Sequence, residues 1–266
     1  MATPTRGTRV MRLRDGAVGW GADRLAVEEP LALRLNGETL AVTMRTPGDD
    51  FDLAVGFLLS EGAVTSAEQV VDLSSCTDDR GGNVLDVVLA PGCEAVPRRF
   101  TVTSACGVCG SASVDAVRAH MPWDVGADGV RLPAAVLSAL PDSLRERQVA
   151  FERTGGLHAA GLADATGRLL CVREDVGRHN AVDKIVGWAA RAGSLPLRGH
   201  VLVVSGRASF ELVQKALRAG VPALVAVSAP SSLAVDLAKA AGMTLAGFVR
   251  DGRMTVYAGA GRVLSA

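Results

Sequence analysis

Two cysteines three positions apart, Cys106 and Cys109, are the residues of this sequence best suited to chemistry. Each is followed by a glycine, which leaves a thiol uncovered. The preceding run, 100–103, is rich in β-branched residues and predicts a strand, and the following run, 114–120, predicts a helix. A helix N-terminus favours a thiolate because its unpaired N–H groups attract negative charge. The pattern therefore indicates sulfur chemistry rather than two small core residues.

Three kinds of thiol chemistry fit this pair to different degrees. Structural zinc would need further ligands, for which His158 and His179 are the candidates, but it usually takes two closely spaced ligand pairs. In a thioredoxin-like fold the redox pair lies in an early β-α unit of a compact single domain. This pair does not match, because it lies at residue 106 and precedes most of the α/β pattern. The third possibility is a thiolate that accepts a sulfane sulfur from a donor protein and passes it to an acceptor. The sequence favours this third possibility and predicts no metal site.

Composition excludes several classes of protein. The 266 residues carry a net charge of zero, which argues against a broad nucleic-acid surface. No apolar run approaches the roughly 18–20 residues of a membrane span, and residues 1–16 lack the apolar core of a secretory signal. We therefore expect a cytoplasmic protein without a membrane span. The other cysteines are expected to have no chemical role, Cys171 in the core and Cys76 and Cys93 in or near loops.

The chain divides into three parts by pattern. We expect residues 1–20 to form a flexible N-terminus with little regular structure. Residues 21–127 are expected to form a small α+β domain that ends in the Cys-x-x-Cys loop. Residues 128–266 alternate strands and helices with short connections, which predicts an α/β domain with a largely parallel sheet covered on both faces.

In the first half, Asn36-Gly37 separates two strand-like runs, 31–35 and 39–44, and predicts a hairpin because both turn positions favour positive φ. A helix is expected over 51–61, ending at Gly62 and packing its apolar face, which includes Phe51, on that hairpin. Further strands are expected over 85–89 and 100–103.

In the second half, a helical stretch is expected to begin at Pro133 and to continue, with a break at Pro141, to about Phe151. The remaining strands are expected at 157–164, 168–173, 200–205, 223–228, 244–249 and 254–258, and the remaining helices at 179–191, 209–219 and 231–241.

Polar residues of the second half gather where strands end, which is where open α/β sheets bind ligands. Several of these clusters lead into helix N-termini, which attract anions, and Arg178 and Arg207 suit phosphate. Each cluster also has a structural explanation: Ser209 and Ser231 as helix caps, Arg178 paired with Glu174, Asp251-Gly252 as a simple turn, and His158 as a satisfied strand residue. Together they predict a pocket for a large phosphorylated ligand. The clusters are 154–158, 174–184, 205–209, 228–232 and 250–253.

Five segments of the chain resemble motifs of the FdhD/NarQ family, sulfurtransferase accessory proteins required for formate dehydrogenase activity. The match covers nearly the whole chain from about Leu25 onward, and the segments occur in the expected order. The segments are Ser104-Ala-Cys-Gly-Val-Cys-Gly110, Thr154-Gly-Gly-Leu-His158, Glu174-Asp-Val-Gly-Arg-His-Asn-Ala-Val-Asp-Lys184, Ser205-Gly-Arg-Ala-Ser-Phe-Glu211 and Ala226-Val-Ser-Ala-Pro-Ser-Ser-Leu-Ala-Val235.

The resemblance implies a fold and a set of partners. The C-terminal half would be a cytidine-deaminase-like three-layer α/β domain beside a smaller α+β domain. The protein would take persulfide sulfur from a cysteine desulfurase and deliver it to the molybdenum bis-guanine-dinucleotide cofactor for formate dehydrogenase. It would bind a GDP-like nucleotide and form a homodimer.

The resemblance also assigns residues. Cys106 would carry the persulfide, and Cys109 would either release the sulfur by attack or stabilise the loop. The cofactor-binding residues would be Phe248, Val249, Arg250, Asp251, Gly252 and Arg253, with Arg178, His179, Arg207 and Ser228.

Deaminase chemistry itself is not expected. It needs His-x-Glu and Pro-Cys-x-x-Cys to hold zinc, whereas this chain has Arg178-His-Asn180 and Arg207-Ala-Ser209 at the corresponding places. A competing interpretation from another class of protein is a chaperone that binds and delivers the cofactor without moving sulfur.

Overall fold

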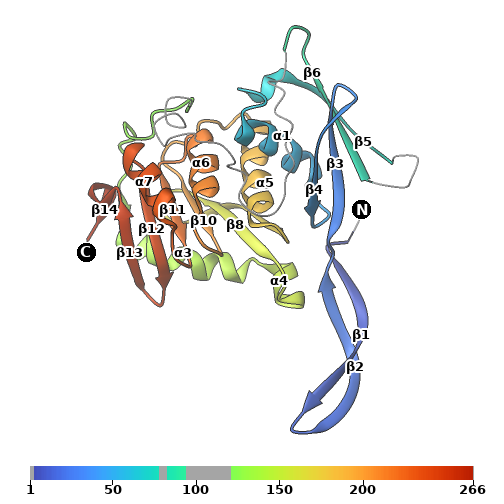
Figure 1. Cartoon of the computed structure of the whole chain (residues 1–266). Coiled ribbons are helices and arrows are strands. Elements are labelled where there is room, and N and C mark those ends of the chain that lie inside the picture. Colours follow the sequence, from blue (N-terminus) through green and yellow to red (C-terminus); the bar gives the residue numbers. More distant parts are fainter. Residues whose placement is uncertain (1–2, 78–82, 94–120, 266) are drawn as a thin grey trace.

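The computed structural model describes residues 3–77, 83–93 and 121–265. The body combines a six-stranded sheet with helices on both faces and a four-stranded sheet at one side, and a two-stranded ribbon projects from it (Figure 1). The expected strand at 100–103, the expected helix at 114–120 and both candidate cysteines lie outside the described residues. No helix among the described residues is long and apolar enough to cross a membrane.

The six-stranded sheet confirms the expected strands of the second half but not their predominantly parallel order. Only the pairs β10–β11 and β11–β12 are parallel. The hairpins β8–β9 and β12–β13 contribute antiparallel pairs, because short turns return the chain beside its own strand. β8 also pairs antiparallel with β10, which follows it in the chain after β9 and α5. The order is β13-β12-β11-β10-β8-β9, with β8 His158–Ala163, β9 Leu169–Asp175, β10 Val201–Val204, β11 Ala223–Ala226, β12 Thr244–Arg250 and β13 Arg253–Ala258.

Helices cover both faces of this sheet, so the domain has three layers and the α/β fold class is confirmed. One face packs against α5 (Arg178–Arg191), α6 (Phe210–Arg218) and α7 (Ser232–Ala240). The other face packs against α3 (Ala134–Glu146) through Leu137, Leu140 and Leu144. The expected break at Pro141 does not occur, because α3 continues through it, and α4 (Val149–Thr154) follows as a separate short helix.

The four-stranded sheet has the order β4-β3-β6-β5. The predicted hairpin of β3 (Glu29–Leu35) and β4 (Glu38–Arg45) is confirmed, with φ of 50° at Asn36 and 85° at Gly37. The strand β6 (Asn83–Leu89) is confirmed as well. The strand β5 (Val70–Thr77) was not predicted, and Cys76 lies near its end. A short 3₁₀ helix, Ala67–Gln69, precedes β5.

Helix α1 (Asp50–Glu61) ends at Gly62 as predicted, but its principal partner is α5 rather than the hairpin. Phe51, expected on the buried face, is 36% exposed. Gly56 of α1 and Gly187 of α5 lie at the crossing, where each faces the other helix's backbone without an intervening side chain. One hydrophobic core therefore runs from Leu33 of the four-stranded sheet to Leu202 of the six-stranded sheet.

The N-terminal residues were expected to lack regular structure, and this prediction is wrong. β1 (Thr5–Arg14) and β2 (Ala17–Ala26) form a continuous antiparallel ribbon. The turn between them is Asp15-Gly16, with φ of 49° and 78°. Asp-Gly between two strand-like runs is a strong hairpin signal, so the sequence contained this feature. The last short elements, β7 (Leu132–Pro133), the 3₁₀ helix Ala260–Arg262 and β14 (Val263–Leu264), close the opposite end of the body.

Candidate functional site

The loops that follow β10, β11 and β12 meet at one edge of the six-stranded sheet, which we call the carboxyl edge. β8 begins at the same edge because it runs antiparallel to β10, and the Ser205 hydroxyl accepts the N–H of Ala159 (2.9 Å) there. The Ser228 N–H donates to the Gly206 carbonyl (3.3 Å), and the Phe248 N–H donates to the Ser228 carbonyl (3.2 Å). Ser228, predicted to bind cofactor, thus joins the loop after β10 to the end of β12 through its backbone.

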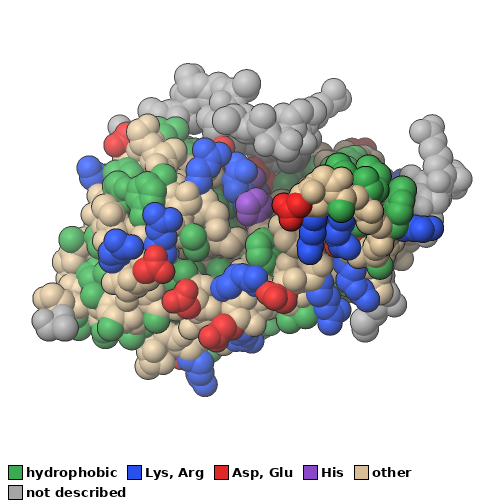
Figure 2. Space-filling model, turned by 90° about the horizontal axis from the view of Figure 1, so that it is seen from below, with side chains coloured by type: hydrophobic (Ala, Val, Ile, Leu, Met, Phe, Trp, Pro, Cys, Tyr) green, Lys and Arg blue, Asp and Glu red, His purple; other side chains and the backbone are tan. Residues whose placement is uncertain are grey.

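The first cavity at this edge, of about 580 Å³, lies toward α3 and α4. Its lining includes His158, Ser205 and Arg250, together with Arg145 and the buried Gln148. Burial lowers the pKa of His158, and electrostatic interactions with Arg178 and His179 lower it further. Figure 2 views the molecule from the side of this edge and shows Lys and Arg side chains beside a histidine. The cavity therefore offers positive charge and a neutral imidazole.

The second cavity, of about 490 Å³, lies where α6 and α7 begin. Arg178, Arg207, Ser209, Glu211 and Ser231 are among its lining residues. Ser231 caps α7, its hydroxyl accepting the N–H of Ala234 (3.3 Å). Ser209 is the N-cap residue of α6 by position, but its hydroxyl lies 3.5 Å from Nε2 of His179.

The side chains of His179 and Glu211 lie close together beside the second cavity. Their Nε2 and Oε2 atoms are 3.8 Å apart. The adjacent His179 ring lowers the pKa of Glu211 to about 2, so Glu211 is a carboxylate at neutral pH. This carboxylate would repel an anionic ligand, whereas Arg178 and Arg207, which line the same cavity, would attract one.

Three arginines predicted to bind cofactor remain unpaired within the described part of the chain. Arg207 and Arg250 are exposed and make no ion pair there. The Nε atom of Arg178 is buried and has no hydrogen-bond partner among those residues. Unpaired guanidinium groups around two cavities suit an anionic ligand, because each can donate charge-assisted hydrogen bonds to phosphate.

The predicted segment 248–253 comprises the end of β12, the turn at Asp251-Gly252 and the first residue of β13. Phe248 has a φ of 53° at a bulge, which turns its ring outward to 44% exposure. Val249 is buried and, with Arg250, lines the first cavity. Asp251 and Gly252 form the tip with φ of 50° and 69°, and Arg253 pairs with Asp251 (3.6 Å) in solvent. The segment therefore offers one cation and one exposed ring to the edge.

Comparison with known proteins identifies the family. A profile of the FdhD/NarQ family matches residues 26–264. The chain belongs to the FdhD/NarQ family. It is 54% identical to the sulfur carrier protein FdhD of Streptomyces avermitilis, over 99% of this chain and 97% of that one. It is 52% identical to the sulfur carrier protein FdhD of Mycobacterium tuberculosis, over 99% and 100% of the two chains.

The fold of this FdhD/NarQ member also matches a solved structure. A crystal structure assigned to a formate dehydrogenase accessory protein from Desulfotalea psychrophila superposes with a TM-score of 0.76 and 25% identity, covering 98% of this chain and 100% of that chain. The recognised family and the α/β fold thus agree with the expectations drawn from the motifs.

In this FdhD/NarQ member, residues of the 174–184 motif do more than line the site, because several of them connect the elements that form it. Glu174 caps α4 by accepting the N–H groups of Ala150 (2.8 Å) and Phe151 (2.7 Å), instead of pairing with Arg178. Asp175 and Lys184 form a buried ion pair at 2.7 Å. The sequence showed these residues to be polar but could not show which of them are buried.

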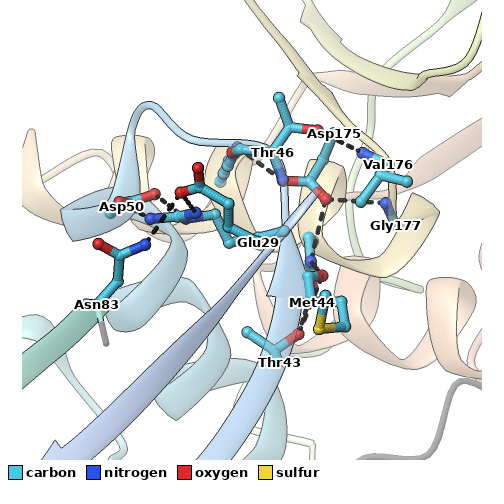
Figure 3. Close-up of polar contacts among 12 residues, drawn as sticks. Glu29, Thr43, Met44, Thr46, Asp50, Asn83, Asp175, Val176 and Gly177 are labelled. Atoms are coloured by element: carbon cyan, nitrogen blue, oxygen red, sulfur yellow. Dashed lines mark hydrogen bonds and ion pairs between the residues drawn. The ribbon is translucent and has the colours of Figure 1, made fainter. Parts of the chain in front are cut away.

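This buried pair joins the two sheets, as Figure 3 shows around Asp175. Asp175 accepts the N–H of Thr46 (3.1 Å), and Lys184 donates to the Thr46 carbonyl (2.9 Å). Asn180 donates to the Met44 carbonyl (2.8 Å). The loop after β4 therefore fixes the start of α5, on which Arg178 and His179 lie.

Two residues outside the predicted cofactor set belong to the carboxyl edge, His158 and Glu211. Both lie in motifs that were recognised, but their neighbours come from other loops, so only the sheet order could place them. Within residues 3–77, 83–93 and 121–265 no cluster of three or more metal-ligating side chains occurs. Cys106 and Cys109 lie outside those ranges, and their assignment as the reactive pair stays a prediction.

Proposed function

We propose that this protein is a cytoplasmic sulfurtransferase that serves formate dehydrogenase maturation. The observation that carries the proposal is the full-length similarity to proteins named sulfur carrier protein FdhD. The neighbour of known structure, assigned as a formate dehydrogenase accessory protein, supports the same client. The unpaired arginines at the carboxyl edge supply the site that an anionic acceptor of sulfur needs.

Sulfur loading begins at Cys106 in this proposal. Its thiolate attacks the outer sulfur of the persulfide on a cysteine desulfurase, a new S–S bond forms, and the donor's own cysteine leaves as a thiolate. The proton of the persulfide stays on the transferred sulfur. No oxidant is required, because the sulfane sulfur keeps its oxidation level. The reaction depends on the thiolate fraction and access of Cys106, which the adjacent glycines favour.

The acceptor is the molybdenum bis-guanine-dinucleotide cofactor, a substrate bound at the carboxyl edge. Arg178 and Arg207 would hold phosphates of a GDP-like moiety in the second cavity, at the helix starts. Arg250 would meet the other end of the ligand in the first cavity, and the exposed ring of Phe248 can stack on a planar group.

Delivery uses Cys109 as the second thiol. Attack of the Cys109 thiolate on the inner sulfur of the Cys106 persulfide forms a disulfide and expels hydrosulfide, which carries away the electron pair of the broken S–S bond. The hydrosulfide becomes the sulfur ligand of the metal. The disulfide must then be reduced by a cellular thiol before the next cycle.

The test compares three single variants after incubation with a cysteine desulfurase and cysteine. Cys106→Ala should lose the adduct of about 32 Da that one sulfur atom adds, and should abolish formate dehydrogenase activation in a deletion strain. Cys76→Ala is the matched control, because Cys76 is exposed in β5. This variant should keep both the sulfur adduct and the activation of formate dehydrogenase. Cys109→Ala should keep the adduct but lose activation if Cys109 releases the sulfur.

Two outcomes would contradict the proposal. Normal activation by Cys106→Ala would exclude transfer through that thiol. A wild-type protein that binds the guanine dinucleotide cofactor and activates the client without ever carrying an adduct would instead be a delivery chaperone.

A further inference from the structure

Gln148, in the short link between α3 and α4 (Figure 1), has a buried side chain that the fold leaves without a partner. The residue lines the first cavity and is only 4% exposed. Its amide group makes no hydrogen bond to any described residue. Buried amides are normally hydrogen-bonded, because an amide taken out of water without a partner is costly. The donors and the acceptor of this side chain are therefore available to a ligand.

The local structure does not explain why this residue is polar. Gln148 directly precedes α4, where a polar side chain often caps a helix, but it does not cap this one. The first N–H groups of α4 donate to Glu174 instead. The hydrogen bonds of Gln148 itself come from its backbone, whose N–H donates to the Arg145 carbonyl (3.2 Å) and whose carbonyl accepts the Glu152 N–H (2.9 Å). Any residue other than proline would make these two bonds, so the fold does not require the amide.

His158 brings a second uncharged polar group to the same cavity. Its side chain is half-buried, and its lowered pKa keeps the ring neutral at pH 7. A neutral imidazole offers one donor and one acceptor. Neither ring nitrogen makes a hydrogen bond within residues 3–77, 83–93 and 121–265. The cavity thus contains two neutral groups that can each donate and accept, and neither is used by the described protein.

The remaining lining suits an uncharged ring better than a polyanion. Arg145 lies over the ring of Phe151, 4.6 Å from its centre, and pairs with Glu152 at 2.7 Å, so its charge is balanced. Asp142 adds a carboxylate to the lining, which would repel phosphate. Apolar walls beside a few polar groups are typical of sites for planar organic ligands. The apolar lining residues include Leu144, Phe151, Leu157 and Val249.

We propose that the first cavity is a subsite for an uncharged planar heterocycle that presents a hydrogen-bond donor beside an acceptor, and that Gln148 recognises this edge. The carbonyl of a carboxamide accepts from a ring N–H while its NH₂ group donates to the neighbouring ring carbonyl. Phosphate offers only acceptors at neutral pH and cannot form this pair. The volume of about 580 Å³ lies within the usual range for small-molecule sites.

The chemical class of the ligand rests on the proposed function. The cofactor of that proposal contains two rings with such an edge, the guanine and the pterin, and both are fused pyrimidinones. Gln148 lies outside all five motifs that resemble the family, so the motifs assign it no role.

The test measures the affinities of GDP, hydroxymethylpterin and inorganic diphosphate by titration calorimetry. Gln148→Leu should weaken binding of the ring that occupies the cavity roughly 10- to 100-fold, because the ring edge loses its partner. A loss for GDP identifies the guanine as the occupant, and a loss for the pterin identifies the pterin. Inorganic diphosphate has no ring and should bind wild type and variant equally. Gln214→Leu is the matched control, because Gln214 is half-buried and outside both cavities, and it should bind all three probes normally.

Thermal unfolding separates recognition of a ligand from a structural role. Because the amide has no partner among the described residues, Gln148→Leu should not lower the Tm. A lowered Tm together with equal weakening of all three probes would overturn the inference, since the amide would then support the fold. Unchanged affinities of Gln148→Leu for both ring probes, or a wild type that binds neither, would also overturn it. Failure of the proposed sulfur transfer would instead appear as a wild type that never carries the sulfur adduct, which these titrations do not measure.

Discussion

Replacing Gly187 with alanine tests how closely α1 and α5 pack. A Cβ on Gly187 would lie 2.6 Å from the carbonyl carbon of Asp52 and 2.8 Å from the nitrogen of Gly56. Ordinary contacts at such positions are 3.4–4 Å, so the helices would have to separate by close to 1 Å or more. The Asp52 carbonyl oxygen is closer still, and all three obstructing atoms belong to backbone, which cannot move aside by changing rotamer. The strain must therefore be absorbed by the whole helix pair.

The magnitude follows from two opposing effects. Alanine is favoured over glycine within a helix by roughly 0.5–1 kcal/mol. Forcing a methyl group into a packed core costs about 1–3 kcal/mol, and the backbone contact places this site at the upper end. Gly187→Ala should therefore lower the free energy of unfolding by about 2 kcal/mol or more. For a chain of 266 residues this corresponds to a fall in Tm of roughly 4 °C.

The assay is urea and thermal unfolding of Gly187→Ala, of Gly56→Ala and of the double variant. The free energy of unfolding should fall less in the double variant than the sum of the two single decreases, because helices already separated by one methyl group accommodate the second. Gly129→Ala is the control, since Gly129 is exposed with open space around it, and it should change stability by less than about 0.5 kcal/mol. A rise in Tm for Gly187→Ala would refute the close crossing.

Two further predictions concern the carboxyl edge. Arg207→Ala should weaken GDP binding, measured by calorimetry, about tenfold, because one charge-assisted hydrogen bond is lost. Arg198→Ala is the control and should bind GDP normally, because Arg198 is exposed and lies outside both cavities. Equal affinities of the two variants would show that Arg207 does not belong to the site. Because folding lowers the pKa of His158, the unfolded chain binds its proton more readily, so stability should fall as the pH drops through about 6.5. His158→Gln should reduce this slope in urea titrations at several pH values, and an unchanged slope would contradict the assigned shift.

The sequence by itself determined the local elements and the family. Asn36-Gly37 fixed a hairpin because its two positions favour positive φ, and Gly62 ended α1 for the same reason. The ordered motifs from residue 104 to residue 235 identified the FdhD/NarQ family, which the profile match confirms. These properties depend on neighbouring residues in the chain, so they can be recognised without a fold.

Only the tertiary structure decided which helices, strands and side chains pack against one another. Helix α1 lies on α5 because two glycines, 131 positions apart in sequence, meet at one crossing, and no periodic pattern signals such a meeting. Glu174 caps α4, and Asp175 pairs with Lys184 beneath the loop at Thr46, although the sequence only shows a polar run. His158 joins Arg250 because β8 runs antiparallel to β10, and strand direction depends on long-range pairing that the local sequence does not encode.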